Sequence, residues 1–372
     1  MAPSAVPPLA APRRTMHGAR PYSTAADFPP LIRAYTEVSQ AVKERNLLRR
    51  AYGFYLGLAG ALLLGFAGAI TGFVLLGHSW FQLLIAAALG ILFTQVAFLA
   101  HEAGHKQILT TGASNSKLAT WLAGIIGMSY SWWDNKHSRH HGNPNKVGKD
   151  PDIEVDTISF LADDAAQSRG FIRWITKRQG WFFFPLLTLE GLNLHYKSFR
   201  HLFSRGKVKD RWLELSIILP RFALLLVPVF LFLPTGMAFA FLGVQLAVFG
   251  VYMGATFAPN HKGMPVIDPH TKLDFFSKQV RTSRNISGGW WASMLMGGLN
   301  YQIEHHLFPS MARPQLAQAR LIVIEHCKKL NVPYTETTLW KSYGIVIRYL
   351  NEMGLAARDP FVCPMTALYR RS

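Results

Sequence analysis

Histidines recur at helical spacing in three short segments of the chain. The first segment reads His101-Glu102-Ala103-Gly104-His105, so two imidazoles stand four residues apart with a glutamate between them. Positions three or four residues apart share one face of a helix, which makes the pair a ready set of metal ligands. The string fits the H-E-x-x-H pattern of zinc proteases, whose glutamate is the general base. It is equally the first part of a larger histidine cluster that binds a different metal.

The other two segments supply further imidazoles at the same kind of spacing. The second holds His137, His140 and His141, and the third holds His305 and His306. An eighth histidine, His261, follows a long apolar stretch. Catalytic zinc takes three protein ligands and a water, so eight imidazoles are too many for one metal and fit two metals with about four ligands each. Imidazole suits Fe, Zn, Cu or Ni, and iron is the choice that adds O2 chemistry.

The elements that carry these histidines are apolar. Half of the 372 residues are hydrophobic and 16% are charged, against about 25% in soluble domains. Residues 51–100 and 222–261 contain no Asp, Glu, Lys or Arg. Each block has the length of two membrane spans of about 20 residues. We therefore predict four spans, at residues 52–76, 81–100, 213–233 and 237–257.

The third predicted span contains Arg221, which has to be accommodated inside the membrane. An arginine at the middle of a span costs about 2.5–3.5 kcal/mol on insertion scales. We expect its guanidinium to reach toward the cytoplasmic surface, and the alternative is that it faces a polar cavity.

The excess of basic residues predicts how the chain is oriented. Lys and Arg number 39 against 21 Asp and Glu, a net charge of +18, but the turns at 77–80 and 234–236 contain neither Lys nor Arg. By the positive-inside rule both termini and all three histidine segments lie on the cytoplasmic side. We therefore predict an all-α integral membrane protein whose four spans carry a cytoplasmic helical cap with a histidine-rich di-metal site. The positive charge is explained by this orientation in the membrane, so no nucleic-acid partner is expected.

The remaining segments predict the domain organisation. Residues 1–30 are rich in Ala and Pro and read as a disordered tail, residues 31–350 as the membrane domain, and residues 351–372 as a C-terminal tail. Residues 181–187, WFFFPLL, are too few to cross and are expected in the membrane interface. Cys327 and Cys363 form no disulfide framework and are expected to be free thiols.

The three histidine segments resemble those of a known family. HEAGH, HSRHH and QIEHH resemble the three histidine boxes of the integral-membrane fatty acid desaturases, and the glutamine of the third box is typical of the front-end branch. The flanks WWDNKHSRHHGNPN and GGLNYQIEHHLFPSM resemble the same branch. The resemblance covers about residues 31–350.

This resemblance implies a chemistry for the cluster. Two iron ions bound by the eight histidines use O2 as co-substrate and remove two hydrogens from adjacent methylenes of an acyl chain, which leaves a cis double bond. His261, in APNHKG, stands where the family has a further ligand. Metal-bound imidazoles are commonly oriented by neighbouring polar groups. The candidates for that supporting role are Glu102, Glu304, Gln302 and Asn260.

The resemblance also implies partners. Many front-end desaturases carry a fused cytochrome b5 domain with an H-P-G-G motif, which this sequence lacks, so we expect a separate donor: a ferredoxin, an iron–sulfur flavoprotein reductase or cytochrome b5. The expected substrate is a long, C18-like acyl chain, with acyl-CoA favoured over an acyl lipid. The basic face would attract the phosphates of CoA or an acidic donor. The expected location is a bacterial cell membrane, and carbon 6 and carbon 9 both remain open as positions of the double bond.

Three alternatives differ in what they leave unexplained. A lipid or alkane hydroxylase of the same superfamily would use the same histidines but insert oxygen. A zinc protease would use Glu102 and leave six of the eight histidines without a role. A metal transporter would place histidines along the spans, which here are nearly free of them. The other histidines read as ordinary polar residues: His17, His78, His195, His201, His270 and His326.

Overall fold

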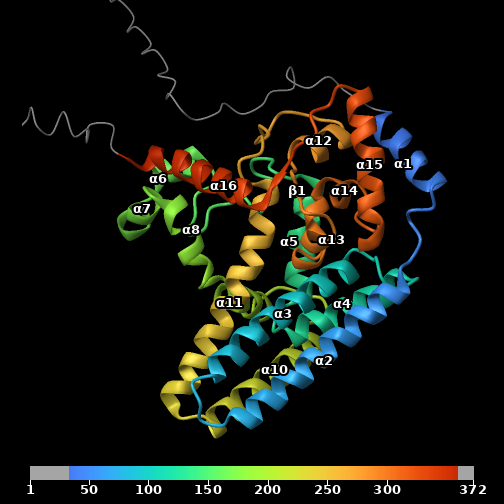
Figure 1. Cartoon of the computed structure of the whole chain (residues 1–372). Coiled ribbons are helices and arrows are strands. Elements are labelled where there is room, and N and C mark those ends of the chain that lie inside the picture. The colour runs from blue at the N-terminus through green and yellow to red at the C-terminus, as the bar shows by residue number, and fades with distance from the viewer. Residues whose placement is uncertain (1–32, 359–372) are drawn as a thin grey trace, which may run out of the picture.

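A computed structural model describes residues 33–358 of the chain. Four apolar helices of 22–27 residues occupy the lower half of Figure 1 and are long enough to cross a membrane. They are α2 (Tyr52–Leu76), α3 (Gln82–Gly104), α10 (Arg211–Phe232) and α11 (Thr235–His261). A segment in hydrocarbon must satisfy its backbone hydrogen bonds internally, which a helix does. The four predicted spans are thus confirmed as helices of spanning length.

Helices α3 and α11 both continue four residues past the predicted ends at residues 100 and 257. The predicted ends followed the loss of apolar composition. The helices persist because the polar side chains of their last turns are buried, among them His101 on α3 and Asn260 and His261 on α11. Both spans therefore deliver histidines on their final turns.

Arg221 of α10 ends against another helix instead of in open water. Its Nε donates to the carbonyl oxygen of Ile125 at 2.9 Å, where helix α4 (Gly112–Ile125) ends. The guanidinium also lies over the rings of Phe93 and Phe222, at 4.6 and 4.8 Å from their centroids. The last carbonyls of a helix lack intrahelical donors, and Arg221 supplies one to the carbonyl of Ile125.

The other helices pack at one end of the four spans (Figure 1). Two groups can be distinguished there. Helices α6 (Ala162–Gln167), α7 (Gly170–Thr176), α8 (Gln179–Leu187) and α16 (Leu339–Gly354) lie toward the upper part of α11. Helix α9 (Glu190–Leu202) follows α8 and packs against the middle of α11, where Gly191 approaches Phe249 and Gly250. Helices α1 (Ala34–Glu44), α5 (Tyr130–Gly142), α12 (Phe275–Arg281), α13 (Gly289–Leu295), α14 (Gln302–Leu307) and α15 (Arg313–Lys329), with the 3-10 turn η2 (Leu299–Tyr301), form the cap.

The cap has an apolar core of its own. Val38 of α1, Phe276 of α12, Ile303 of α14 and Val323 of α15 are all fully buried in it. Two three-residue strands, β1 (Asn285–Ser287) and β2 (Glu336–Thr338), pair in parallel and are the only strands in residues 33–358. The prediction of a helical fold is confirmed apart from this small pair of strands, which at three residues each are too short to show a strand pattern in the sequence.

The C-terminal boundary differs from the prediction. Helix α16 continues to Gly354 and a 3-10 turn, η3, runs on to Ala357, so the predicted tail does not begin at 351. The helix continues because Val346 and Leu350 are buried against Phe183 and Leu187 of α8. The predicted tail at 1–30 and residues 359–372 lie outside the described residues.

Other sequence predictions are met in part. Residues 181–187 lie in α8, where Phe183 and Leu187 face inward and Trp181 is 69% exposed, so their place at a membrane interface stays a prediction. Cys327 is a free, buried thiol, and Cys363 lies outside the described residues.

A buried ion pair joins the spans to the cap. Arg313, at the start of α15, donates from Nε and from a terminal nitrogen to the two carboxylate oxygens of Glu102 on α3, both at 2.6 Å. The two side chains are 1% and 2% exposed. A bidentate arginine–carboxylate pair is directional as well as strong, so it sets where α15 sits on the end of α3.

We predict that Arg313→Met destabilises the protein by about 3–5 kcal/mol, because it leaves the Glu102 carboxylate buried without a counter-charge. The measurement is thermal unfolding of the detergent-solubilised protein. The matched control is Lys329→Met, which breaks the exposed Lys329–Glu325 pair at 2.7 Å and should change stability by about 0.5 kcal/mol or less. Equal losses in the two variants would show that the buried pair has no special role.

Candidate metal centre

The structure brings the eight predicted histidines together where α3, α5, α11 and α14 meet. Their ring nitrogens form two groups, and within each group the ligand atoms lie within 4.8 Å of one another. One group holds His101, His105, His137, His141 and His305, and the other holds His140, His261 and His306. Helix α5 contributes to both groups, because His137 and His141 belong to the first and His140 to the second.

The imidazoles approach closely enough to share a cation. The Nε2 atoms of His105 and His137 are 2.8 Å apart, and those of His101 and His137 are 3.1 Å apart. In the second group the Nε2 atoms of His140 and His261 are 3.3 Å apart. Ring nitrogens that converge in this way offer their lone pairs to one point.

The grouping of five and three differs from the predicted four ligands for each metal. His141 lies at the boundary, because its ring stacks on His306 of the other group with centroids 4.1 Å apart and an interplanar angle of 10°. Spacing along one helix predicts which side chains share a face, but the division between two groups depends on how the helices meet.

Three imidazoles are oriented by side chains or carbonyls that the sequence did not single out. His140 Nδ1 is 3.0 Å from Asp150 Oδ1, His306 Nδ1 is 2.9 Å from Gln279 Oε1, and His261 Nδ1 is 3.0 Å from the carbonyl oxygen of Thr282.

Each contact leaves Nε2 free to point into the cluster, as in the supporting shells of metal sites. Of the three partners, only Asp150 had a signal in the sequence, as the first carboxylate after HSRHH.

The predicted supporting role of Glu102 and Glu304 is wrong in this structure. Glu102 is bonded to Arg313, and Glu304 accepts hydrogen bonds from Asn285 Nδ2 at 2.7 Å and from the Tyr334 hydroxyl at 2.9 Å. Each carboxylate is next to a histidine in sequence, which places it about 100° around the helix, on another face.

The pairing of Glu102 also has a chemical consequence. Its carboxylate is committed to Arg313 and is not placed as the general base that the protease alternative needs.

The other two supporting candidates do contact the cluster. Gln302 Nε2 lies 2.9 Å from His261 Nε2, and Gln302 Oε1 accepts a hydrogen bond from Asn260 Nδ2 at 3.0 Å. Asn260 therefore reaches the imidazole of His261 through the amide of Gln302.

Burial keeps most of these imidazoles neutral. Burial, together with nearby His140, lowers the pKa of His305 to about 3, and burial also lowers the pKa of His141 and of His306 well below the ordinary value. At His140 burial acts in the same direction, but the carboxylates of Asp150 and Asp152 outweigh it and raise the pKa.

The cluster also leaves nitrogen atoms unpaired. Among the described residues, one buried ring nitrogen outside the cluster, His195 Nε2, has no hydrogen-bond partner; inside the cluster there are five, namely His101 Nδ1, His141 Nδ1 and Nε2, His305 Nε2 and His306 Nε2. Buried polar atoms are nearly always paired, so these orphans mark a place for another partner. Neutral imidazoles with free lone pairs are the donor set that iron, zinc, copper and nickel accept.

The histidines predicted to be ordinary lie outside both groups. His195 Nδ1 is 3.0 Å from the carbonyl oxygen of Gly127, and His326 Nε2 is 2.9 Å from that of Ala34. His201 lies 3.2 Å from Ser131 Oγ, and His78 and His270 are exposed. His17 lies outside the described residues.

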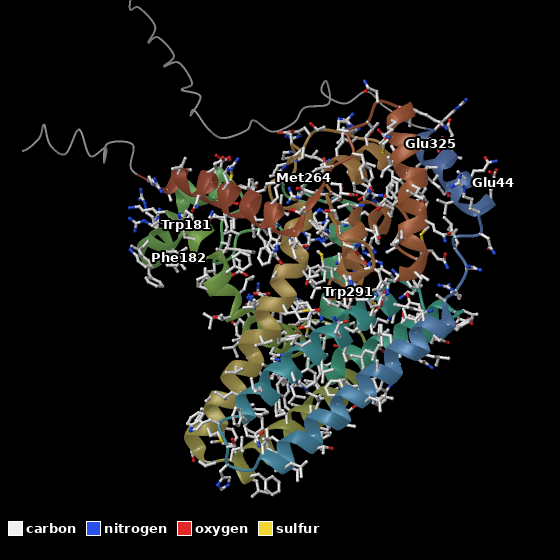
Figure 2. All side chains as sticks on the ribbon, in the orientation of Figure 1. Glu44, Trp181, Phe182, Met264, Trp291 and Glu325 are labelled. Carbon is white, nitrogen blue, oxygen red and sulfur yellow. The ribbon has the colours of Figure 1, made fainter. Side chains whose placement is uncertain are left out.

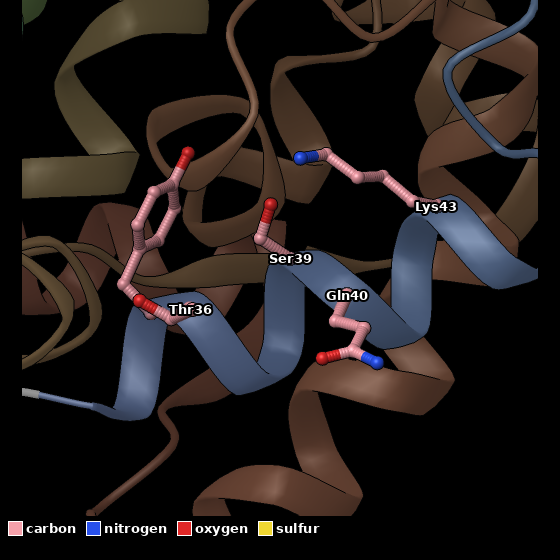
Figure 3. A pocket seen from close by; sticks show the side chains of 5 residues that line it. Thr36, Ser39, Gln40 and Lys43 are labelled. Carbon is pink, nitrogen blue, oxygen red and sulfur yellow. The ribbon is translucent and has the colours of Figure 1, made fainter.

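A hollow on the outer side of the cap is unrelated to the cluster. It is lined by Tyr35, Thr36, Ser39, Gln40 and Lys43, all on α1 (Figure 3). None of these residues belongs to either histidine group.

Several known proteins are similar to this chain in sequence. A sequence model of the fatty acid desaturase family matches residues 78–338. The Delta(8)-fatty-acid desaturase 2 of Arabidopsis thaliana is 32% identical over 312 residues, which cover 79% of this chain and 68% of that protein. The Acyl-lipid (9-3)-desaturase of Borago officinalis is 29% identical over 313 residues, with the same coverage.

A relative from an animal matches over a longer stretch. The Delta(6)-fatty-acid desaturase fat-3 of Caenorhabditis elegans is 23% identical over 339 residues, which cover 87% of this chain and 75% of that protein. The family match takes in all three histidine segments and His261. The chain therefore belongs to the fatty acid desaturase family.

Proposed function

We propose that this protein is an O2-dependent desaturase that introduces a cis double bond into a long-chain acyl substrate at a di-iron centre. The observation that carries the proposal is the convergence of eight buried or half-buried imidazoles at the end of four apolar helices. Family membership supports the reaction class.

The donor set fits two metal ions. His101, His105, His137, His141 and His305 would hold one iron, and His140, His261 and His306 would hold the other, with Gln302 beside it. When bound, a di-iron centre supplies the oxidising chemistry by which O2 and two electrons remove two hydrogens from adjacent methylenes.

The chain's own residues prepare the site for that chemistry. Asp150, Gln279 and the carbonyl of Thr282 fix three imidazole rings, so the ligand nitrogens need little reorganisation. The rings of Trp133 and Phe257 lie 5.6 and 6.1 Å from the ring of His101. This side of the five-histidine group is therefore apolar, as an alkyl chain requires.

The proposed substrate is a C18-like acyl chain carried by CoA. The net charge of +18 supports a phosphate-bearing carrier, whereas the Borago relative is named for an acyl lipid. An assay with both carriers separates them. Electrons are proposed to come from a separate ferredoxin, iron–sulfur flavoprotein reductase or cytochrome b5.

The proposed location is a bacterial cell membrane, with the cap and both termini in the cytoplasm. The absence of Lys and Arg from the short turns at 77–80 and 234–236 supports this orientation.

We predict that cells of simple fatty acid content that express this protein with a redox donor gain one new cis double bond in their acyl chains. His140→Ala should abolish the product, because His140 belongs to the three-histidine group and is held by Asp150. Mass spectrometry of derivatised total lipids measures the product and gives the position of the double bond.

The matched control is His270→Asn, which removes an exposed imidazole outside both groups and should keep the product. An alcohol that carries oxygen-18 from labelled O2, in place of the olefin, would contradict the proposal and indicate a hydroxylase. If His140→Ala still forms the product, His140 is not a required residue of the site.

We predict that the purified protein contains about two iron ions per chain and that Asp150→Asn weakens iron retention about 10–100-fold, because it removes the carboxylate that orients His140. Metal content by mass spectrometry against increasing chelator measures this. Asp156→Asn is the control, since Asp156 pairs with Lys197 on the surface. Zinc in place of iron, or identical chelator curves for the two variants, would count against the proposed centre.

A further inference from the structure

Helix α13 exposes an apolar surface at the junction of cap and spans. Trp290 and Trp291 are 63% and 76% exposed, and Leu295, one turn on from Trp291, is 49% exposed. None of the seven residues of this helix, all of them described, is buried. Figure 2 shows Trp291 where the cap meets the upper ends of the spans.

The end of α13 lies beside the spans, below the histidines. The hydroxyl of Tyr252 on α11 donates to the carbonyl oxygen of Leu295 at 2.6 Å. Gln95 Nε2 on α3 contacts both the Tyr252 hydroxyl at 2.7 Å and the carbonyl oxygen of Met294 at 3.2 Å. Gln95 precedes His101 by six residues, about 9 Å along a helix that rises 1.5 Å per residue. The last turn of α13 is therefore at the depth of the apolar spans.

These hydrogen bonds are those that a helix end needs in a membrane. The last carbonyls of a helix have no intrahelical donor, and in hydrocarbon no water can supply one. Two span side chains supply donors to the carbonyls of Met294 and Leu295. Exposed tryptophans are favoured at the boundary between headgroups and acyl chains.

Glycines let α13 close against the spans. Gly297 has φ 60°, and a Cβ there would lie 2.4 Å from Cγ of Phe98 on α3. At the other end, Gly288 and Gly289 also have positive φ, at 147° and 58°. Only glycine combines this conformation with so close an approach.

A line of aromatic rings leads from this contact to the histidines. Phe98 lies 5.8 Å from Tyr252 and 6.5 Å from Phe257, and Phe257 lies 6.1 Å from His101, all measured between ring centroids. Helix α13 thus covers the seam between α3 and α11 that leads to the five-histidine group.

We propose that α13 is inserted in the bilayer interface and acts as a door, held shut by Gln95 and Tyr252, through which the acyl chain reaches the histidines. The partner of its exposed face is the lipid bilayer. The insertion is independent of the proposed function, whereas the role as a door rests on it.

The insertion is tested with a nitroxide on Trp291→Cys in a Cys363→Ser background, in nanodiscs of mixed phosphatidylcholine and phosphatidylglycerol. Collision with O2, which partitions into lipid, should exceed collision with a water-soluble nickel chelate several-fold. Leu64→Cys, 76% exposed at the middle of α2, is the lipid reference, and Glu325→Cys on the cap is the water reference (Figure 2). Cys327 is 1% exposed, and the protein without an introduced cysteine measures its background labelling.

Accessibility at 291 that matches the lipid reference supports insertion. Accessibility that matches the water reference overturns it and indicates a surface open to solvent or to a soluble partner.

The hydrogen bond by which Tyr252 holds Leu295 of α13 is tested in the same labelled protein. Tyr252→Phe removes the hydroxyl that holds Leu295 and should increase the mobility of the nitroxide at 291. Tyr343→Phe is the matched control, because its hydroxyl donates to the carbonyl of Ala255, also on α11, at 2.9 Å and does not touch α13. Unchanged mobility in Tyr252→Phe, or an equal change in both variants, overturns the proposal that Tyr252 holds α13 in place.

The passage of the chain is tested with a C18 acyl-CoA that carries a mid-chain diazirine. After photolysis, label mapped by tandem mass spectrometry to residues 289–296 supports the door. Label on other segments alone overturns the door and leaves the acyl substrate standing. No label anywhere in the protein counts against the acyl substrate itself, and the door falls with the proposed function.

Discussion

Eight imidazoles share one buried volume, and the rest of the structure depends on the approach of their nitrogen atoms. Nitrogens such as Nε2 of His105 and of His137 lie 2.8 Å apart, a distance at which two lone pairs repel unless a proton or a metal lies between them. Burial disfavours a second proton on these rings, since it lowers the pKa of His305 to about 3, but each neutral imidazole keeps one N–H that can lie between two such nitrogens. Five ring nitrogens of the cluster have no hydrogen-bond partner at all, and these free donor positions are compatible with a metal centre.

The histidines of the cluster lie near the ends of their helices, and buried polar interactions hold two of these ends in place. Arg284 holds the last turn of α11, because its side chain donates to the carbonyls of Pro259 and Lys262 and its backbone N–H donates to that of Asn260 at 2.8 Å. The pair of Glu102 and Arg313 holds the end of α3. A guanidinium can satisfy several carbonyls at a helix end, which accounts for the burial of Arg284, whereas Arg313 is buried with a carboxylate as its partner.

Residue spacing was sufficient to predict the parts of this site that depend on one helix at a time. Seven of the histidines follow from their spacing, His261 from its place after the fourth span, and the four spans from the absence of charge, and all of these are local properties of the sequence. The partners of the imidazoles are not local. Asp150, Gln279 and Thr282 come into place only when α5, α12 and α11 meet, and the same packing commits Glu102 to Arg313 and Glu304 to Asn285 and Tyr334.

The position of the cluster at the end of the spans reconciles two opposing demands. Polar side chains are costly in hydrocarbon, yet an acyl substrate is dissolved in it. Histidines on the last turns of α3 and α11 keep the imidazoles among cap residues that can satisfy them, while Phe98 and Phe257 on the same helices line the side that faces the apolar spans. The proposed acyl substrate would then need to insert its alkyl chain only a few residues along the spans to reach the site, with its polar head at the surface.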